Sequence, residues 1–115
     1  MRRAVLFLAV AALAGGVSAY DSNGAFVTFV GNKTCGGFLN DTETISGAKL
    51  QYVAYIEGYI SAINMRVNGK ADFFAGTDQE ARYRFVYEYC RAHPLDMFAT
   101  GLFHLTKTAG VPMPK

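Results

Sequence analysis

Two cysteines, Cys35 and Cys90, constrain the fold of this chain more than any other feature. The chain has 115 residues, which is enough for one domain. A domain of this size buries only about two thirds of its unfolded surface, so a covalent link adds usefully to its stability. A Cys35–Cys90 disulfide would close a loop of 55 positions (90 − 35). In the chain-entropy model such a link contributes about 4 kcal/mol.

The redox state of these cysteines depends on the compartment, and the N-terminal segment predicts export. Arg2 and Arg3 precede an apolar run at 4–13, and small residues follow at 17–19. This order is typical of a secretory signal, and the run is shorter than the roughly 20 apolar residues of a membrane-spanning helix. We expect residues 1–19 to be a cleaved signal peptide and the mature protein to be periplasmic or secreted by a bacterium. The alternative is a membrane anchor.

In an oxidising compartment, an even cysteine count predicts one disulfide, Cys35 to Cys90. The alternative is a pair of free thiols, one of them catalytic. After cleavage we expect no stable membrane insertion.

Removal of the signal peptide changes the charge balance of the chain. The full sequence has 11 basic and 9 acidic residues, and Arg2 and Arg3 lie in the signal, so 11 − 2 = 9 basic residues remain against 9 acidic ones. A near-neutral protein without a basic cluster lacks the charge that phosphate binding needs. The composition therefore disfavours nucleic acid and favours another protein as the partner.

Apolar spacing predicts helices in the first two thirds of the mature chain. Residues 20–33 form an irregular N-terminal arm, and 34–39 should form a short helix that presents Cys35 and ends in the polar run 40–44. A long helix follows at 47–67. Its core stripe is spaced by 3, 4, 3 and 4 positions and consists of Val53, Ile56, Ile60, Ile63 and Val67. Gly58 lies inside this helix, which predicts the close approach of another helix.

Two further helices are expected after a turn at 72–76 that returns Phe73 and Phe74 to the core. The sequence Thr77-Asp78-Gln79-Glu80 is a capping box and predicts a helix that begins at Thr77 and ends near Ala92. Its expected inward residues are Ala81, Phe85, Val86, Tyr89 and Cys90.

Pro94 is suited to the first turn of a last helix. Its apolar stripe is Leu95, Phe98, Leu102 and Leu105, and the tail is 109–115. The expected fold is therefore all-α: a small, disulfide-stapled orthogonal bundle of about four helices within 34–108.

No residue pattern predicts catalysis, a metal or another cofactor. His93 and His104 are 11 positions apart, which is not a ligand spacing. Glu57 could act as an acid or base, but its possible partners, Glu88 and Asp96, lie on other predicted elements. We expect structural roles for His93, His104 and Glu57 and a protein that is not an enzyme.

Tyrosines are the candidate binding residues, because this side chain is favoured at protein interfaces. The candidates for a partner-binding face are Tyr52, Tyr55, Tyr59, Tyr83 and Tyr87. The alternative is that some of them complete the core of so small a domain.

The order of several segments resembles the HdeA-like group of small bacterial periplasmic proteins. The segments are Thr34-Cys35-x-x-Phe38-Leu39, the helix containing Tyr55-Ile56-Glu57-Gly58-Tyr59-Ile60-Ser61-Ala62-Ile63-Asn64, Gly76-Thr77-Asp78, and Tyr89-Cys90-Arg91-Ala92-His93-Pro94-Leu95. The chain is also similar to the related Tai-like group, immunity proteins against type VI secreted amidases. Together these resemblances cover roughly residues 34–105.

The resemblance implies an all-helical fold with bridged cysteines and a function in binding. The HdeA-like group implies an acid-stress chaperone, a dimer that opens in acid and holds unfolding clients on the exposed apolar surface. The second group implies an inhibitor of a secreted cell-wall-degrading enzyme. The chain departs from the first group in its Gly58-Tyr59 helix and in lacking a lysine-rich, highly charged tail.

Overall fold

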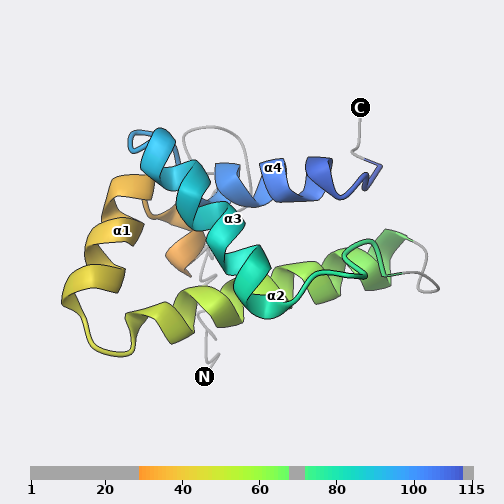
Figure 1. The fold of residues 1–115 in the computed structure, drawn as a ribbon, viewed down its shortest axis with the longest axis horizontal. Helices are drawn as coiled ribbons and strands as arrows, with labels where there is room; N and C mark the ends of the chain where they lie inside the picture. Colours follow the sequence, from red (N-terminus) through yellow and green to blue (C-terminus); the bar gives the residue numbers. More distant parts are fainter. Residues whose placement is uncertain (1–28, 68–71, 113–115) are drawn as a thin grey trace, which may run out of the picture.

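The protein is described by a computed structural model in which residues 29–67 and 72–112 are placed. A short 3-10 helix, η1 (Phe29–Asn32), precedes four α-helices. These are α1 (Cys35–Thr44), α2 (Ala48–Val67), α3 (Gln79–Ala92) and α4 (Phe98–Thr108) (Figure 1). The all-α, four-helix prediction is confirmed. The predicted signal peptide, most of the predicted arm (20–28) and the last tail residues (113–115) lie outside the described residues.

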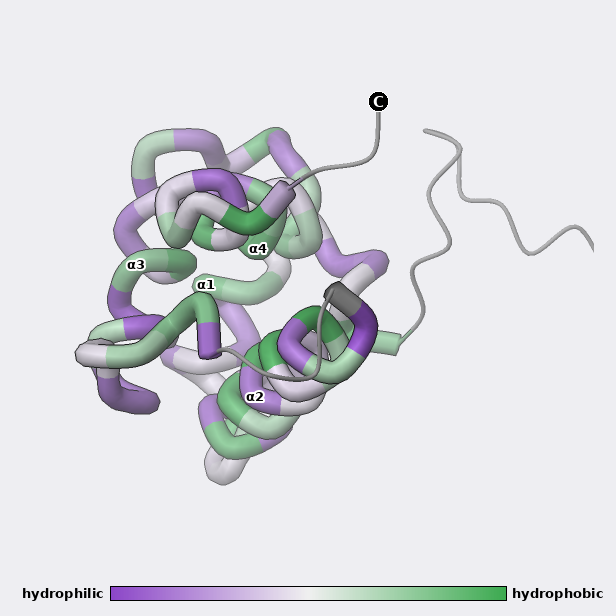
Figure 2. The backbone as a smooth tube through the Cα atoms, turned by 90° about the vertical axis from the view of Figure 1, so that its right-hand side faces the viewer, coloured by the Kyte–Doolittle hydropathy of each residue, from purple (hydrophilic) through white to green (hydrophobic). Residues whose placement is uncertain are grey.

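Helix α3 is the centre of the arrangement, because it packs against α1, α2 and α4. In Figure 1 α2 and α4 lie on either side of it, and in Figure 2 α2 forms a separate layer beside the group of α1, α3 and α4. The predicted stripe of α2 faces this group: Val53, Ile56 and Ile60 are buried and Ile63 is partly buried. Hydrophobic burial of one helical stripe therefore holds α2 in place.

Aromatic rings from three helices meet in the middle of the core. The ring centroid of Phe38 lies 4.6 Å from that of Tyr52 and 4.9 Å from that of Phe98, and the last two are 5.1 Å apart. The rings are tilted or edge-on to one another, which is the arrangement that their quadrupoles favour. All three are at most 1% exposed. Helices α1, α2 and α4 thus share one aromatic contact.

The polar run 40–44 continues α1 instead of ending it, so this helix is longer than predicted. Thr34 caps its start, because its Oγ1 accepts a hydrogen bond from the Gly37 amide at 3.0 Å. Further along, the hydroxyls of Thr42 and Thr44 donate to carbonyls of the same helix. The polar run is therefore part of the helix and does not mark its end.

Helix α3 begins one residue later than the capping box predicts. Asp78 is the N-cap, and its Oδ1 accepts from the Ala81 amide at 2.7 Å. The Thr77 hydroxyl is engaged elsewhere, because it donates to the Phe74 carbonyl and accepts from Arg82. Ala81 is exposed and is not an inward residue as predicted, whereas Val86 and Cys90 are fully buried.

Helix α4 begins at Phe98 and not at Pro94, and Leu95 is 93% exposed, so both predictions were wrong. A helix that began at Pro94 would need the Phe98 amide to donate to the Pro94 carbonyl. Instead the Phe98 amide donates to the carbonyl of Lys33 at 2.8 Å, and the Pro94 carbonyl accepts from the amide of Gly36 at 2.9 Å. Contacts with a segment about 60 residues earlier thus replace the first helical turn.

The close helix approach predicted at Gly58 occurs at Gly101. Gly58 is exposed, and a Cβ there would have nothing within 4 Å. At Gly101, a Cβ would lie 3.0 Å from Val86 Cγ1 and 3.2 Å from Tyr89 Cδ1. Gly101 therefore allows α4 to pack directly on α3.

We expect Gly58→Ala and Gly101→Ala to have opposite effects on stability. At position 58 alanine should raise the free energy of unfolding by about 0.5–1 kcal/mol, because only the helix propensity changes. At position 101 the same gain in helix propensity is offset by crowding against α3. The free energy of unfolding of Gly101→Ala should therefore be about 1–3 kcal/mol lower than that of Gly58→Ala. Urea denaturation at neutral pH measures both. Equal stabilities would contradict the contact at Gly101.

Candidate functional site

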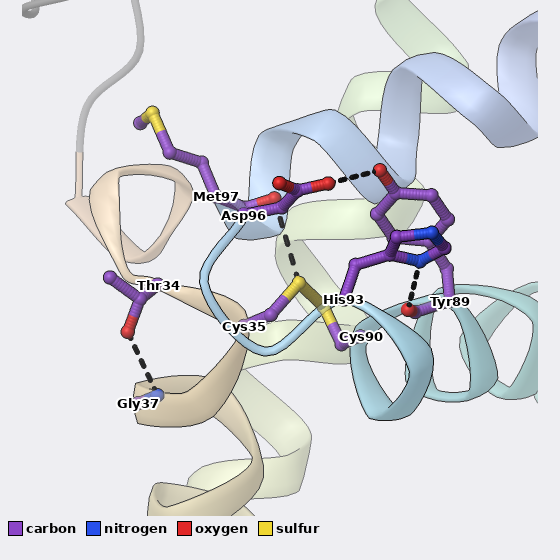
Figure 3. Close-up of a disulfide and its surroundings, with 8 residues drawn as sticks. All are labelled: Thr34, Cys35, Gly37, Tyr89, Cys90, His93, Asp96 and Met97. Atoms are coloured by element: carbon purple, nitrogen blue, oxygen red, sulfur yellow. Dashed lines mark hydrogen bonds between the residues drawn. A yellow bond between two sulfur atoms is a disulfide. The ribbon is translucent and has the colours of Figure 1, made fainter.

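A disulfide joins Cys35, the first residue of α1, to Cys90, near the end of α3 (Figure 3). Both residues are fully buried, and no free cysteine is present in the part of the chain that the structure describes. The predicted pairing is confirmed, and the alternative of two free thiols does not apply to this state.

Backbone hydrogen bonds reinforce the same corner. The segment 93–97 between α3 and α4 lies against residues 33–36, where Thr34 and Met97 form an isolated β-bridge. Three bonds cross the contact: Cys35 N to Asp96 O at 2.7 Å, Gly36 N to Pro94 O at 2.9 Å and Phe98 N to Lys33 O at 2.8 Å. We call the disulfide and these three bonds the disulfide clamp. The clamp joins α1, α3 and α4 and contains no titratable group.

Both histidines stack on Tyr89, next to the clamp. The ring centroid of Tyr89 lies 4.3 Å from that of His93 and 4.6 Å from that of His104. The Tyr89 hydroxyl donates to Asp96, and burial together with this bond raises the pKa of Tyr89 to about 12 (Figure 3). Among the described residues no three metal-ligating side chains come together.

The candidate acid–base residues do not converge in the structure. Glu57 pairs with Arg82, Glu88 with Arg91, and Asp96 with Tyr89. Each carboxylate thus has a different partner.

The structure separates the five candidate tyrosines into two groups. Tyr52 and Tyr83 are 1% and 7% exposed, so these two belong to the core and offer little surface to a partner. Burial raises the pKa of the Tyr83 phenol. Tyr55, Tyr59 and Tyr87 are partly buried against the same core.

The polar contacts of α2 include several carboxylates, whose charge depends on pH. Four contacts that join α2 to α1, to α3 or to the turn at 72–76 each include one carboxylate. They are Tyr52–Asp41, Glu57–Arg82, Lys49–Glu80 and Asn64–Asp72. We call these four the α2 carboxylate contacts. A further contact, between the hydroxyls of Tyr59 and Thr106 at 2.9 Å, includes no carboxylate.

Asp41 provides the contact that reaches furthest into the core. The hydroxyl of Tyr52 donates to its Oδ2 at 2.7 Å, and Lys33 Nζ lies 3.2 Å from the same oxygen. The Tyr52 bond lowers the pKa of Asp41, with a further lowering by Lys33. Burial and the carboxylate raise the pKa of Tyr52. The charged form of Asp41 is therefore favoured by the folded state.

Glu57 and Arg82 form a two-pronged ion pair between α2 and α3. Arg82 Nε lies 2.9 Å from Oε1 of Glu57, and Nη2 lies 2.7 Å from Oε2. Arg82 also donates to the Thr77 carbonyl at 2.7 Å. Glu57 raises the pKa of Arg82. This paired geometry is the strong form of a side-chain ion pair.

The remaining two contacts lie nearer the surface. Asp72 accepts from the Phe74 amide at 2.9 Å and from Asn64 Nδ2 at 2.8 Å, and these bonds lower the pKa of Asp72. Lys49 and Glu80 are about half exposed, so solvent screens their 3.1 Å pair. The sequence patterns pointed to Glu57 as a possible acid or base and to Glu80 as part of a capping box. They did not point to Asp41, Asp72 or Arg82, because the contact partners of these residues on α2 are distant in sequence.

We expect Asp41→Asn to lower the free energy of unfolding by about 1–2 kcal/mol at pH 7, because a hydrogen bond to a charged acceptor is lost. The pKa of Asp41 is lower in the folded state than its ordinary value, so its contribution is present at neutral pH. It is lost as the pH falls from about 4 through the lowered folded pKa. The difference in the free energy of unfolding between wild type and Asp41→Asn should therefore disappear in acid.

Urea denaturation from pH 7 to pH 2 measures this difference. Glu43→Gln is the matched control, since Glu43 is an exposed carboxylate on the same helix. A difference that stayed constant down to pH 2 would contradict the role assigned to Asp41.

In the ranges 29–67 and 72–112, no helix has the length and apolarity needed to cross a membrane. Comparison with known proteins found no match among protein-family models, curated proteins or solved structures.

Proposed function

We propose that this protein is an exported, periplasmic holdase that is activated by acid and binds unfolding proteins. The observation that carries the proposal is the difference between two sets of contacts. The disulfide clamp contains no titratable group, whereas each of the α2 carboxylate contacts includes one. Beside the clamp, the described residues show one carboxylate contact, between Tyr89 and Asp96. Acid therefore removes more of the side-chain contacts that attach α2 than of those that attach α1, α3 and α4 to one another.

Protonation acts on these contacts in a defined direction. The lowered pKa values of Asp41 and Asp72 mean that the folded state favours their charged forms. Their contribution to stability is lost as the pH falls through those lowered values. Glu57 holds Arg82 through its charge as well as through two hydrogen bonds.

Separation of α2 would expose apolar surface on both sides of the contact. On α2 the released side chains include Tyr52, Val53, Ile56 and Ile60. On the remaining group, rings such as Phe38 would lose their cover. A contiguous apolar surface of this kind binds non-native chains.

Charge repulsion adds to the effect of the individual contacts. Below the pKa range of carboxylates, the nine basic side chains of the predicted mature chain and its two histidines carry positive charge with little to offset it. Such self-repulsion destabilises a compact state. The disulfide limits how far the chain can then expand.

An exported location is supported by two features. The Cys35–Cys90 disulfide is of the kind that persists in oxidising compartments. The N-terminal sequence pattern predicts a signal peptide.

The holdase proposal is tested by client aggregation. The purified mature protein should suppress aggregation of unrelated acid-unfolded clients at about pH 2–3, where carboxylates are protonated, and should not do so at pH 7. Inactivity at low pH contradicts the proposal. One stoichiometric partner captured at neutral pH, together with inactivity in acid, would favour an inhibitor of a secreted enzyme instead.

We expect Glu57→Gln to raise the pH at which α2 separates by about 0.5 unit. Glutamine imitates the protonated side chain, so the variant should lose about 1.5 kcal/mol from this contact. If the separation of α2 takes up two protons, this loss corresponds to a shift of about 0.5 pH unit. Near-UV circular dichroism of the tyrosines follows the separation, and client aggregation follows the activity.

The pH midpoint of α2 separation and the pH midpoint of client protection should move together. Glu88→Gln is the matched control, because Glu88 pairs with Arg91 within α3 and does not touch this contact. A shift of the opening without a shift of the activity would show that α2 separation is not the activating step.

A further inference from the structure

A half-open apolar hollow lies between the start of α3, the turn at 72–76 and the end of α4. Its volume is about 370 Å³. Three phenylalanines line it: Phe74, which is 2% exposed, and Phe73 and Phe85, which are partly buried. Buried Leu105 also lines it. We call this feature the α3–α4 hollow.

Small side chains keep the hollow open. Ala75, Ala81 and Ala109 lie on its wall, one from each of the three surrounding segments. Protein interiors are otherwise close-packed, so a larger side chain at one of these positions would fill much of the space.

The wall of the hollow offers no unpaired charge. Arg82 lines it, but its guanidinium is held by both oxygens of Glu57 and by Thr77. An anion or a cation would therefore lose its hydration without gaining an opposite charge. A neutral occupant incurs no such cost.

Two hydroxyls supply hydrogen-bond acceptors. Thr77 and Thr108 line the hollow, and their hydroxyls donate their protons to the carbonyls of Phe74 and His104, at 2.6 and 2.8 Å. The Thr77 hydroxyl also accepts from Arg82, so Thr108 is the less engaged of the two. A hydroxyl oxygen that donates its proton can still accept hydrogen bonds. The wall therefore suits an occupant with one N–H or O–H donor.

We propose that the α3–α4 hollow binds a small neutral molecule that has an aromatic ring and one hydrogen-bond donor, such as a phenol or an indole. Cavities of about 150 Å³ accept benzene, so a volume of this size has room for one or two fused rings. Aromatic walls with a few placed polar groups are the usual composition of such sites. This binding does not depend on acid activation.

The test is a titration of the ¹⁵N-labelled mature protein at pH 7 with indole and with phenol, followed by amide chemical shifts. Saturable shifts should be confined to the residues around 73–85 and 105–109. Benzoate and benzylamine, which carry opposite charges, should bind at least about tenfold more weakly because ions are costly to desolvate.

Ala81→Leu and Ala109→Leu should each reduce indole binding at least about tenfold by filling the hollow. Ala54→Leu is the matched control, because Ala54 is exposed on α2 and does not line the hollow. The amide spectra away from the substitution verify that each variant is folded. Binding that persists in both filled variants, or shifts that do not saturate, would overturn the proposal. Binding of a capped aromatic peptide but of neither free ring would also overturn it, and would assign the hollow to a protein partner.

Discussion

The disulfide clamp is the constraint on which the rest of the fold depends. It brings the first turn of α1 against the segment between α3 and α4, so the Cys35–Cys90 bond and its neighbouring backbone bonds fix three helices at one corner. Gly36 allows this approach, since a Cβ there would lie only 3.3 Å from the Pro94 carbonyl. The direction of α4 follows from it, because the Phe98 amide donates to Lys33.

Helix α2 lies within the loop that the disulfide closes but takes no part in the clamp. It is attached by its apolar stripe and by side-chain contacts, four of which include a carboxylate. The chain therefore has one set of contacts that is insensitive to pH and one that is not. The disulfide adds a covalent link to the packing and backbone bonds that hold α1, α3 and α4 together without α2.

The sequence predicted the features that depend on local pattern. The spacing of Val53, Ile56 and Ile60 defines the inner face of α2, and the cysteine count predicted the disulfide. The predictions that were wrong at Pro94 and Thr77 involve competition from residues outside the local pattern. Segment 33–36 takes the backbone groups that would have begun a helix at Pro94, and Arg82 engages Thr77 instead of leaving it as a cap. The carboxylate contacts were missed for the same reason, since they join residues 8 to 31 positions apart.

The magnitudes decide how acid could release α2. A hydrogen bond contributes about 1 kcal/mol net, and an exposed ion pair contributes less. Burial of a single large apolar side chain contributes about 1.5–3 kcal/mol, and the α2 stripe contains several of them. Loss of the carboxylate contacts alone is therefore smaller than the hydrophobic term. Release requires the added repulsion of an uncompensated positive charge. Tyr52 contributes to both the hydrophobic burial and the carboxylate contacts. Its ring is in the aromatic core, and its hydroxyl binds Asp41.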